Sequence, residues 1–205
     1  MISKVEFHFD FGSPNAYLCH RVLPDISSRT QTEIRYVPIL LGGIFKATNN
    51  RSPMEQYANV RNKKEYLAEE TQRFLSRHNI TDFKRNPHFP VNTLMAMRGA
   101  VFAMKNSWAQ TYTDIMYQAM WEEERNIANL ETFRSILENA DLPALEIIEA
   151  CNDPEIKKSL IESSMNSVER GNFGSPTFFA GDAMFFGKDS LEDFERQLIS
   201  QATAV

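Results

Sequence analysis

Strand patterns occur only near the two ends of this chain, and a long run of helical patterns separates them. Residues 4–11 alternate polar and apolar side chains, which is typical of a strand with one buried face. A second strand pattern covers residues 33–38. Near the other end, residues 177–180 and 183–186 flank a two-residue turn, Gly181-Asp182, which favours a hairpin. We therefore expect the two ends of the chain to form one sheet.

Each pair of strands is accompanied by a helix. Ser13 suits a helix N-cap, and Pro14 suits the first helical position, where a missing N–H costs nothing. Pro24 lies within the apolar stripe of this helix and predicts a kink or a break. The last helix is predicted to begin at Asp189, with Glu192 at the spacing of a capping box. The ends of the chain are thus βαβ and ββα units.

Helical patterns fill the middle of the chain. They are predicted over residues 54–78, 92–106, 108–124, 130–139, 144–150 and 153–170. An insertion of helices between two halves of one sheet explains this order better than two consecutive domains. The prediction is an α/β domain of residues 1–40 and 172–205, interrupted by a helical domain of residues 41–171.

Composition and charge exclude several classes of protein. A chain of 205 residues with 42% hydrophobic residues can bury a core. Its net charge of −5, with no basic block, argues against nucleic acid as a partner. No apolar segment approaches the ~20 residues that span a membrane, and Met1–Lys4 leads into no targeting segment. Two cysteines, Cys19 and Cys151, with no histidine cluster, predict no metal and a reduced, cytoplasmic protein.

The order of elements, with a proline just before the first hairpin strand, resembles the thioredoxin fold. Proteins of that fold place their chemistry at the start of the first helix, beside the loop that holds this proline, which is usually cis. The first of these places, residues 10–18, resembles the active-site segment of the periplasmic disulfide oxidoreductases, which also carry a helical insertion. However, residues 13–16 are Ser-Pro-Asn-Ala where those enzymes have Cys-x-x-Cys. Dithiol–disulfide exchange needs an attacking thiolate and a second thiol, so it is excluded at this site.

Serine at the first of these positions is similar to two narrower families, the 2-hydroxychromene-2-carboxylate isomerases and the kappa-class glutathione transferases. The resemblance extends over essentially the whole chain. It rests on residues 9–14, 41–53, 86–92, 174–177 and 184–191. Each of these segments is weak evidence alone, but their order on the expected elements makes the signal specific.

The resemblance implies residues that hold glutathione. Ser13 is expected to orient the glutathione thiolate, whose pKa a helix N-terminus lowers. The simpler alternative is that Ser13 only caps its helix. Ser175 and Pro176 are expected to form the cis-proline loop that holds the cysteinyl part, or merely a rigid turn. The γ-glutamyl end is expected at the start of the last helix, at Lys188, Asp189 and Ser190, where Asp189 has helix capping as its alternative role.

A polar segment after residues 39–45 and a turn before residue 90 complete the expected site. The resemblance assigns Asn50 to glutathione and Lys46, Asn49 and Arg51 to the substrate. A charged surface loop is the alternative, and the choice between the two asparagines stays open. His88 and Phe89 are expected to wall the substrate side, although an exposed loop histidine is more often structural.

The resemblance implies a glutathione-dependent isomerase that converts a cis to a trans double bond in an aromatic ring-cleavage product. Glutathione would act as a cofactor, adding reversibly through its thiolate without being consumed. The partners implied are a small aromatic carboxylate, glutathione and a second copy of the chain in a homodimer. One alternative is a kappa-type transferase or peroxidase that consumes glutathione. The other is a thioredoxin-fold binding protein without turnover.

Overall fold

The two ends of the chain form one four-stranded mixed sheet, as predicted. The computed structural model describes residues 4–203; residues 1–3, on which the expected absence of a targeting segment partly rests, and 204–205 lie outside them. The strand order is β2-β1-β3-β4. β1 (Val5–Phe9) runs parallel to β2 (Arg35–Pro38) and antiparallel to β3 (Thr177–Ala180). β4 (Ala183–Phe186) returns antiparallel to β3 through the predicted Gly181-Asp182 turn.

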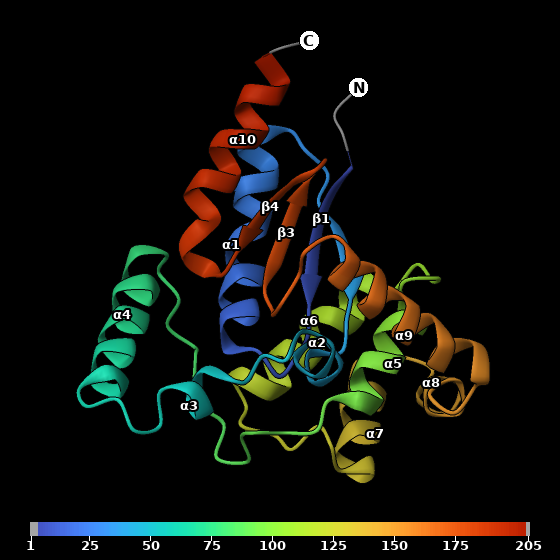
Figure 1. Ribbon diagram of the computed structural model, residues 1–205. Coiled ribbons are helices and arrows are strands. Elements are labelled where there is room, and N and C mark those ends of the chain that lie inside the picture. Colours follow the sequence, from blue (N-terminus) through green and yellow to red (C-terminus); the bar gives the residue numbers. More distant parts are fainter. Residues whose placement is uncertain (1–3, 204–205) are drawn as a thin grey trace.

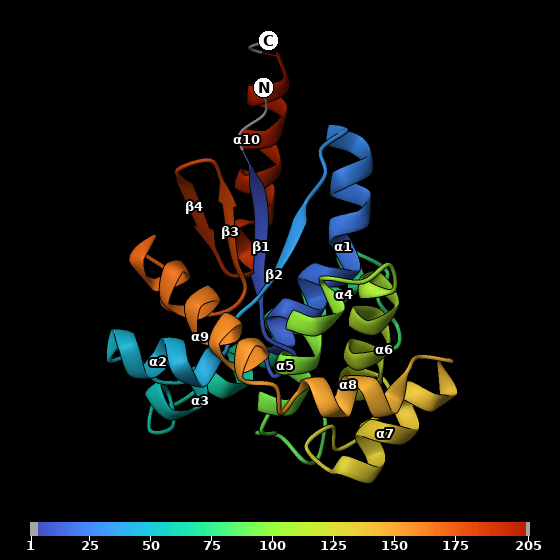
Figure 2. The same cartoon turned by 90° about the vertical axis from the view of Figure 1, so that its right-hand side faces the viewer.

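Helices cover both faces of this sheet. On one face α1 (Pro14–Thr30) and α10 (Leu191–Thr203) lie side by side (Figure 1). Phe7 and Phe178 face α10, where the Phe178 ring stacks on Phe194 at 4.8 Å. On the other face lies α9 (Pro154–Glu169), which packs against β2 and against α2 (Leu41–Thr48) (Figure 2). The central strands β1 and β3 are therefore buried on both sides, whereas the edge strands β2 and β4 stay partly exposed.

Most of the remaining helices lie at one end of the sheet (Figure 2), and α4 (Lys63–Arg77) stands apart from them at the side of the molecule (Figure 1). The others are α3 (Pro53–Gln56), α5 (Leu94–Ala103), α6 (Ala109–Trp121), α7 (Leu130–Asn139) and α8 (Ala144–Ala150). A 3₁₀ turn, η1 (Lys188–Ser190), precedes α10. The helical patterns predicted from residue 92 onward correspond to α5 through α9. None of the helices within residues 4–203 is both long enough and apolar enough to cross a bilayer.

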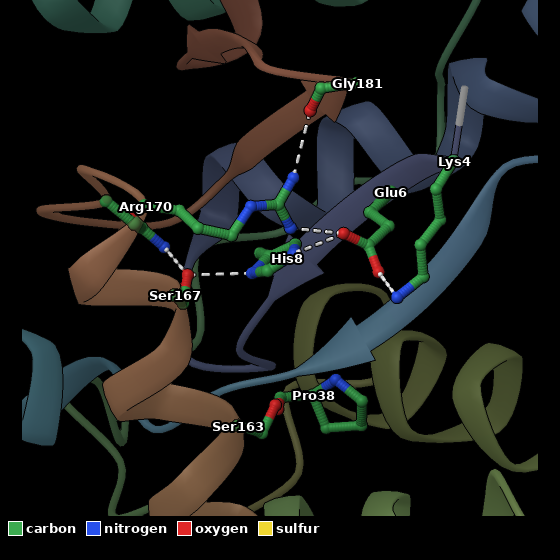
Figure 3. A network of polar contacts seen from close by, with 9 residues as sticks. Lys4, Glu6, His8, Pro38, Ser163, Ser167, Arg170 and Gly181 are labelled. Atoms are coloured by element: carbon green, nitrogen blue, oxygen red, sulfur yellow. Dashed lines mark hydrogen bonds and ion pairs between the residues drawn. The ribbon is translucent and has the colours of Figure 1, made fainter.

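The prediction that the first strand has one buried face is wrong, because α9 covers the face that carries its polar residues. Glu6 and His8 are each only 3% exposed. Figure 3 shows their contacts: Glu6 pairs with Lys4 at 2.9 Å and with Arg170, while His8 Nδ1 lies 2.7 Å from Ser167 Oγ. Burial alone would raise the pKa of Glu6, but hydrogen bonds from Lys4 and Arg170 lower it to about 2. Burial lowers the pKa of His8 to about 4, against the opposing effect of Glu6.

Three helix predictions need correction. The pattern over 54–78 is two helices, α3 and α4, because a capping box at Ser52 fixes a short first helix and the intervening Val60 finds no core and stays 50% exposed. The segment 41–48 is a helix where none was predicted, because its adjacent glycines weaken the helical signal. Asp189 lies inside η1 instead of capping α10, since its carboxylate pairs with Lys188.

Pro24 does not break α1. The helix runs from residue 14 to residue 30 with Pro24 inside it. Figure 2 shows its axis changing direction along the helix, which agrees with the predicted kink. The first half of α1 therefore points in a different direction from the second half, and the candidate site lies at the start of the first half.

Candidate functional site

Ser13 begins α1 and lies against the loop that precedes β3. Its side chain caps the helix by accepting a hydrogen bond from Ala16 N–H at 3.2 Å. Its hydroxyl donates to the backbone carbonyl of Ser175 at 2.8 Å. The Ser175–Pro176 bond is cis, which confirms the prediction. The single hydroxyl proton of Ser13 is thus used in a hydrogen bond to the cis-proline loop in this structure.

Asp10 was not singled out by the sequence, although its carboxylate connects three segments beside Ser13. Oδ1 accepts hydrogen bonds from Gly12 N–H and from the Thr93 hydroxyl, both at 2.8 Å. Oδ2 accepts from Leu41 N–H, also at 2.8 Å. Burial raises the pKa of Asp10, and these bonds only partly oppose that shift. A signal was present: an acidic residue between two phenylalanines, directly after a strand whose apolar residues face the core.

The backbone of Asp10 also joins Ser13 to the cis-proline loop. Its N–H donates to Ser175 Oγ at 3.2 Å, and its carbonyl accepts from Ser13 N–H at 3.0 Å. Both partners of the Ser13–Ser175 hydrogen bond are therefore bonded to one residue.

Asn172 holds the cis-proline loop from its other side and was likewise missed. Its amide oxygen accepts from Gly174 N–H and from the Thr177 hydroxyl, both at 2.8 Å. Its amide nitrogen donates to Ser167 Oγ at 2.7 Å. Because Ser167 also contacts His8, the loop is linked to the polar cluster under α9. Only the three-dimensional fold reveals this link, since a single asparagine in a loop predicts no particular partner.

The two neighbouring asparagines differ in what they contact. Asn50 donates to the backbone carbonyl of Phe173 at 2.8 Å and so ties the end of α2 to the cis-proline loop. Asn49 is the C-cap of α2, in the left-handed region with φ 53°, and its side chain is exposed. Lys46 and Arg51 are exposed as well. Within residues 4–203, no hydrogen bond or ion pair joins the side chains of Lys46, Asn49 or Arg51 to Ser13 or Ser175.

Lys188 is a buried cation that connects η1 to α4. It is 3% exposed, and its ammonium contacts the carboxylates of Asp189 and, at 3.5 Å, Glu70. It also lies 5.6 Å from the centroid of the Phe74 ring. Asp189 remains largely exposed, and the Ser190 hydroxyl donates to the Gly187 carbonyl at 2.9 Å. The start of the last helix therefore presents a carboxylate above a buried ammonium.

Phe89 and His88 lie on a turn with a second cis bond, Phe89–Pro90. The Phe89 ring packs on Trp121 with centroids 5.7 Å apart, and the Trp121 indole donates to the Phe11 carbonyl at 2.8 Å. Phe89 is thereby connected to the loop that carries Ser13. His88 is exposed and lines a shallow depression with Arg125 and Asn129, so the described part of the chain gives it no contact with Ser13.

The chain supplies no thiolate to this site. Cys19 and Cys151 are both buried. Burial raises the pKa of the Cys19 thiol well above its usual range and that of Cys151 to about 11. Ala16, at the place of the second redox cysteine, is fully buried. Residues 4–203 also contain no group of three or more His, Cys, Asp or Glu side chains suited to a metal ion.

Comparisons with known proteins find relatives over almost the whole chain. A 2-hydroxychromene-2-carboxylate isomerase from Pseudomonas putida is 30% identical over 193 residues, covering 91% of this chain and 90% of that protein. Another from Sphingobium xenophagum is 25% identical over 201 residues, covering 97% and 100%. Glutathione S-transferase kappa 1 from Rattus norvegicus is 24% identical over 201 residues, covering 92% and 87%.

Solved structures and a family model extend the comparison. A structure of 2-hydroxychromene-2-carboxylate isomerase matches with a TM-score of 0.81 at 25% identity, over 95% of this chain and 93% of that one. A probable DsbA oxidoreductase from Streptomyces coelicolor matches with a TM-score of 0.78 at 16% identity, over 98% and 89%, which shows the fold alone. The predicted thioredoxin fold with inserted helices is confirmed. The model for the DsbA-like thioredoxin domain matches residues 4–199, and the chain therefore belongs to that family.

Proposed function

We propose that this protein is a glutathione-dependent isomerase of the 2-hydroxychromene-2-carboxylate type. The observation that carries the proposal is the Ser13 hydroxyl, which lies at the N-terminus of α1 and 2.8 Å from the Ser175 carbonyl of the cis-proline loop. Relatives that are 25–30% identical over almost the whole chain are named as such isomerases. When bound, glutathione would supply the nucleophilic thiol that the chain itself lacks at this site.

The residues around Ser13 suit a sulfur anion. A helix N-terminus favours negative charge through its free N–H groups and its dipole. Pro14 and the fully buried Ala16 place no competing acid or thiol in the first turn. Asn172 and Asn50 hold the neighbouring loop in place, so the backbone at Ser175 offers a fixed edge for an extended peptide.

In the proposed role, Ser13 turns its hydroxyl proton from the Ser175 carbonyl to the bound sulfur. A hydrogen bond to a charged group contributes about 1.5–3 kcal/mol, against about 0.5–1.5 kcal/mol for a neutral pair, and this difference favours the sulfur as the acceptor once the Ser175 carbonyl has another donor. No proton leaves the serine in this step. The Ser13 oxygen keeps its lone pairs for Ala16 N–H, and the helix start is preserved.

The residues at the start of the last helix suit the charged γ-glutamyl end of glutathione. Asp189 presents an exposed carboxylate to an ammonium group, while the buried Lys188 beneath it balances that charge. Ser190, Ser175, Pro176 and Asn50 lie on the segments that join this end to Ser13. Exposed Lys46 and Arg51 offer cations to a substrate carboxylate, with Asn49, His88 and Phe89 as the remaining predicted contacts.

The deciding experiment follows both the substrate and glutathione. With 2-hydroxychromene-2-carboxylate and a small amount of glutathione, we expect isomerisation over many turnovers while the glutathione concentration stays constant. Loss of glutathione in proportion to product would instead support a kappa-type transferase, as the more distant relatives are named. Absence of glutathione binding in calorimetry would contradict both enzymes and leave a binding protein without turnover.

Two expectations about the whole molecule stay predictions. The homodimer is checked by light scattering during size-exclusion chromatography, which gives twice the chain mass if the prediction holds. The cytoplasmic location is checked by cell fractionation.

A further inference from the structure

Three helices begin at the carboxyl and backbone groups of Asp10. α1 is capped by Ser13, whose N–H donates to the Asp10 carbonyl at 3.0 Å. α2 begins at Leu41, whose N–H donates to Oδ2 at 2.8 Å. α5 follows Thr93, whose hydroxyl donates to Oδ1 at 2.8 Å. These starts are far apart in sequence and meet at one buried side chain.

The N-cap residues of two of these helices make no capping hydrogen bond through their own side chains, although Asn92 Oδ1 accepts from Leu94 N–H at the start of α5. Leu40, the N-cap of α2, has no polar side-chain group, and the Thr93 side chain makes no cap hydrogen bond to α5. Asp10 takes that place for α2 by accepting the hydrogen bond from its first residue. Because helix N-termini carry partial positive charge, their convergence stabilises a carboxylate that no cation contacts. The described residues place no Lys, Arg or His in contact with this carboxylate; its recorded partners are Leu41, Gly12 and Thr93.

The carboxylate has little freedom to move. A Cβ atom on Gly12 would lie 3.1 Å from Thr93 Cγ2 and 3.3 Å from Asp10 Oδ1, closer than the neighbours can easily accept. Phe9 and Phe11 on either side are fully buried. Asp10 is itself 1% exposed. The packing around Asp10 therefore holds its carboxylate in one position.

We propose that Asp10 is the positioning residue of the site: its carboxylate and backbone set the starts of α1, α2 and α5 and the place of the cis-proline loop. Ser13 and Ser175 are held through its backbone, and α2, which ends beside Asn50, is held through Leu41. The link to turnover rests on the proposed function, whereas the control of helix starts does not. Asp10 touches neither cofactor nor substrate in this role.

The test begins with Asp10→Asn, which keeps the shape of the side chain. An amide has one acceptor oxygen, so at least one of the two backbone N–H groups, of Gly12 or Leu41, loses its acceptor. We expect hydrogen exchange of that amide to be about fivefold faster or more, as loss of one hydrogen bond implies. The control, Glu6→Gln, neutralises the other buried acid of the same segment and should leave the protection of the Gly12 amide relative to the Leu41 amide unchanged, because its effect on the free energy of unfolding acts on both amides alike. Equal protection of both amides in Asp10→Asn and the parent protein would overturn the inference.

Turnover then tests whether the position matters for the reaction. In the parent protein we expect Asp10→Asn to lower kcat/KM more than tenfold. In the Ser13→Ala variant the same substitution should lower kcat/KM by less than about twofold. Residues that act through one another are non-additive in this way, whereas general loosening of the fold multiplies the two effects. Unchanged activity in Asp10→Asn, or multiplied losses in the double variant, contradicts the positioning role.

Two further results keep the outcomes distinct. If Asp10→Asn does not fold, Thr93→Val removes one donor to Asp10 with little change in shape, and its expected loss of kcat/KM is smaller, about threefold, for one lost hydrogen bond. If the unmodified protein shows no glutathione-dependent turnover, the proposed function fails. The exchange measurement on Gly12 and Leu41 then decides the inference by itself.

Discussion

Glu6 and Asp10 are two buried acids in the same short segment of chain, and their surroundings are opposite. Glu6 lies within β1 and pairs with Lys4 and Arg170, which lower its pKa to about 2 against the effect of burial. Asp10 follows β1 and meets only neutral donors, so that burial raises its pKa. They are 3% and 1% exposed, respectively. Burial alone therefore does not explain the difference; the partners do.

The difference separates a structural end of the segment from a functional end. An acid with cations beside it is stabilised in its charged form, and its removal is expected to affect the free energy of unfolding. An acid held by helix N-termini keeps a desolvation cost, and acids with pKa values shifted in this way are frequent at functional sites. The loop that holds Ser13 lies beside Asp10, whereas Glu6 lies under α9 (Figure 3).

The largest expected effect is at the functional end, in Ser13→Ala. Loss of a donor to a charged group predicts a fall in kcat of about 30- to 100-fold. The lost N-cap costs about 1 kcal/mol of stability. Steady-state kinetics with saturating glutathione, together with urea unfolding, measure the two effects.

The matched control for Ser13→Ala is Asp153→Ala. Asp153 caps α9 by accepting from Glu155 N–H at 2.6 Å, and no hydrogen bond connects it to the cis-proline loop among the described residues. It should lose a similar amount of stability and keep full activity. If both variants lose activity equally, capping explains Ser13 and its proposed chemical role is wrong.

The next effect is at the structural end, in Glu6→Gln. Removing this charge leaves Arg170 and Lys4 without their buried partner. Breaking a fully buried pair costs about 3–5 kcal/mol, and because both cations are partly exposed we expect about 2 kcal/mol here. Isomerase activity should stay within twofold of the parent protein. A large loss of activity with unchanged stability would reverse the assignment of the two ends.

An effect of similar size is the response of stability to pH, which His8 dominates at this end. Its pKa is lowered from 6.5 to about 4 in the folded protein, so the unfolded chain binds the proton more tightly. The stabilisation is present above pH 6.5 and is lost as the pH falls toward 4. The free energy of unfolding is expected to fall by up to about 2 kcal/mol between pH 7 and pH 5, because the titration of His8 is linked to that of Glu6.

Urea unfolding across this pH range measures the loss, with His8→Gln as the comparison. The glutamine keeps a polar contact for Ser167 but has no proton to gain. Part of the dependence should remain, since burial and Arg77 also lower the pKa of His78. An unchanged pH slope in His8→Gln would show that His8 does not carry the effect.

Much of this architecture is predictable because it depends on short-range signals. Ser13 with Pro14 marks the start of α1, and Gly181-Asp182 marks the hairpin turn, as the structure confirms. The absence of a thiol at residue 13 excludes dithiol–disulfide exchange there. Each of these signals needs only neighbouring residues to be interpreted.

The parts that escaped prediction depend on contacts between distant segments. Glu6 and His8 were expected to face solvent, and only the packing of α9, with Ser167 and Arg170, buries them. Asp10 bonds to Leu41 and Thr93, which no local pattern relates to it. Whether a polar strand residue is buried depends on the distant segment that packs over it. The periodicity of the strand carries no information about that segment.

The smallest expected effect distinguishes the two asparagines at the end of α2. Asn50→Ala removes the hydrogen bond to the Phe173 carbonyl, and also those that the Asn50 amide oxygen accepts from Arg51 N–H and from the Gln56 side-chain amide. The lost bond to the Phe173 carbonyl, about 1 kcal/mol, should raise the KM for glutathione about fivefold with kcat unchanged. Asn49→Gly is the control, because glycine keeps the left-handed C-cap at φ 53° while removing the exposed side chain. Its KM for glutathione should not change. Asn50 and Asp10 both form hydrogen bonds to the cis-proline loop. An effect on KM alone would mean that both residues are needed to hold this loop in the position that binds glutathione. An equal rise in KM in both variants would show instead that the end of α2 matters only through its backbone.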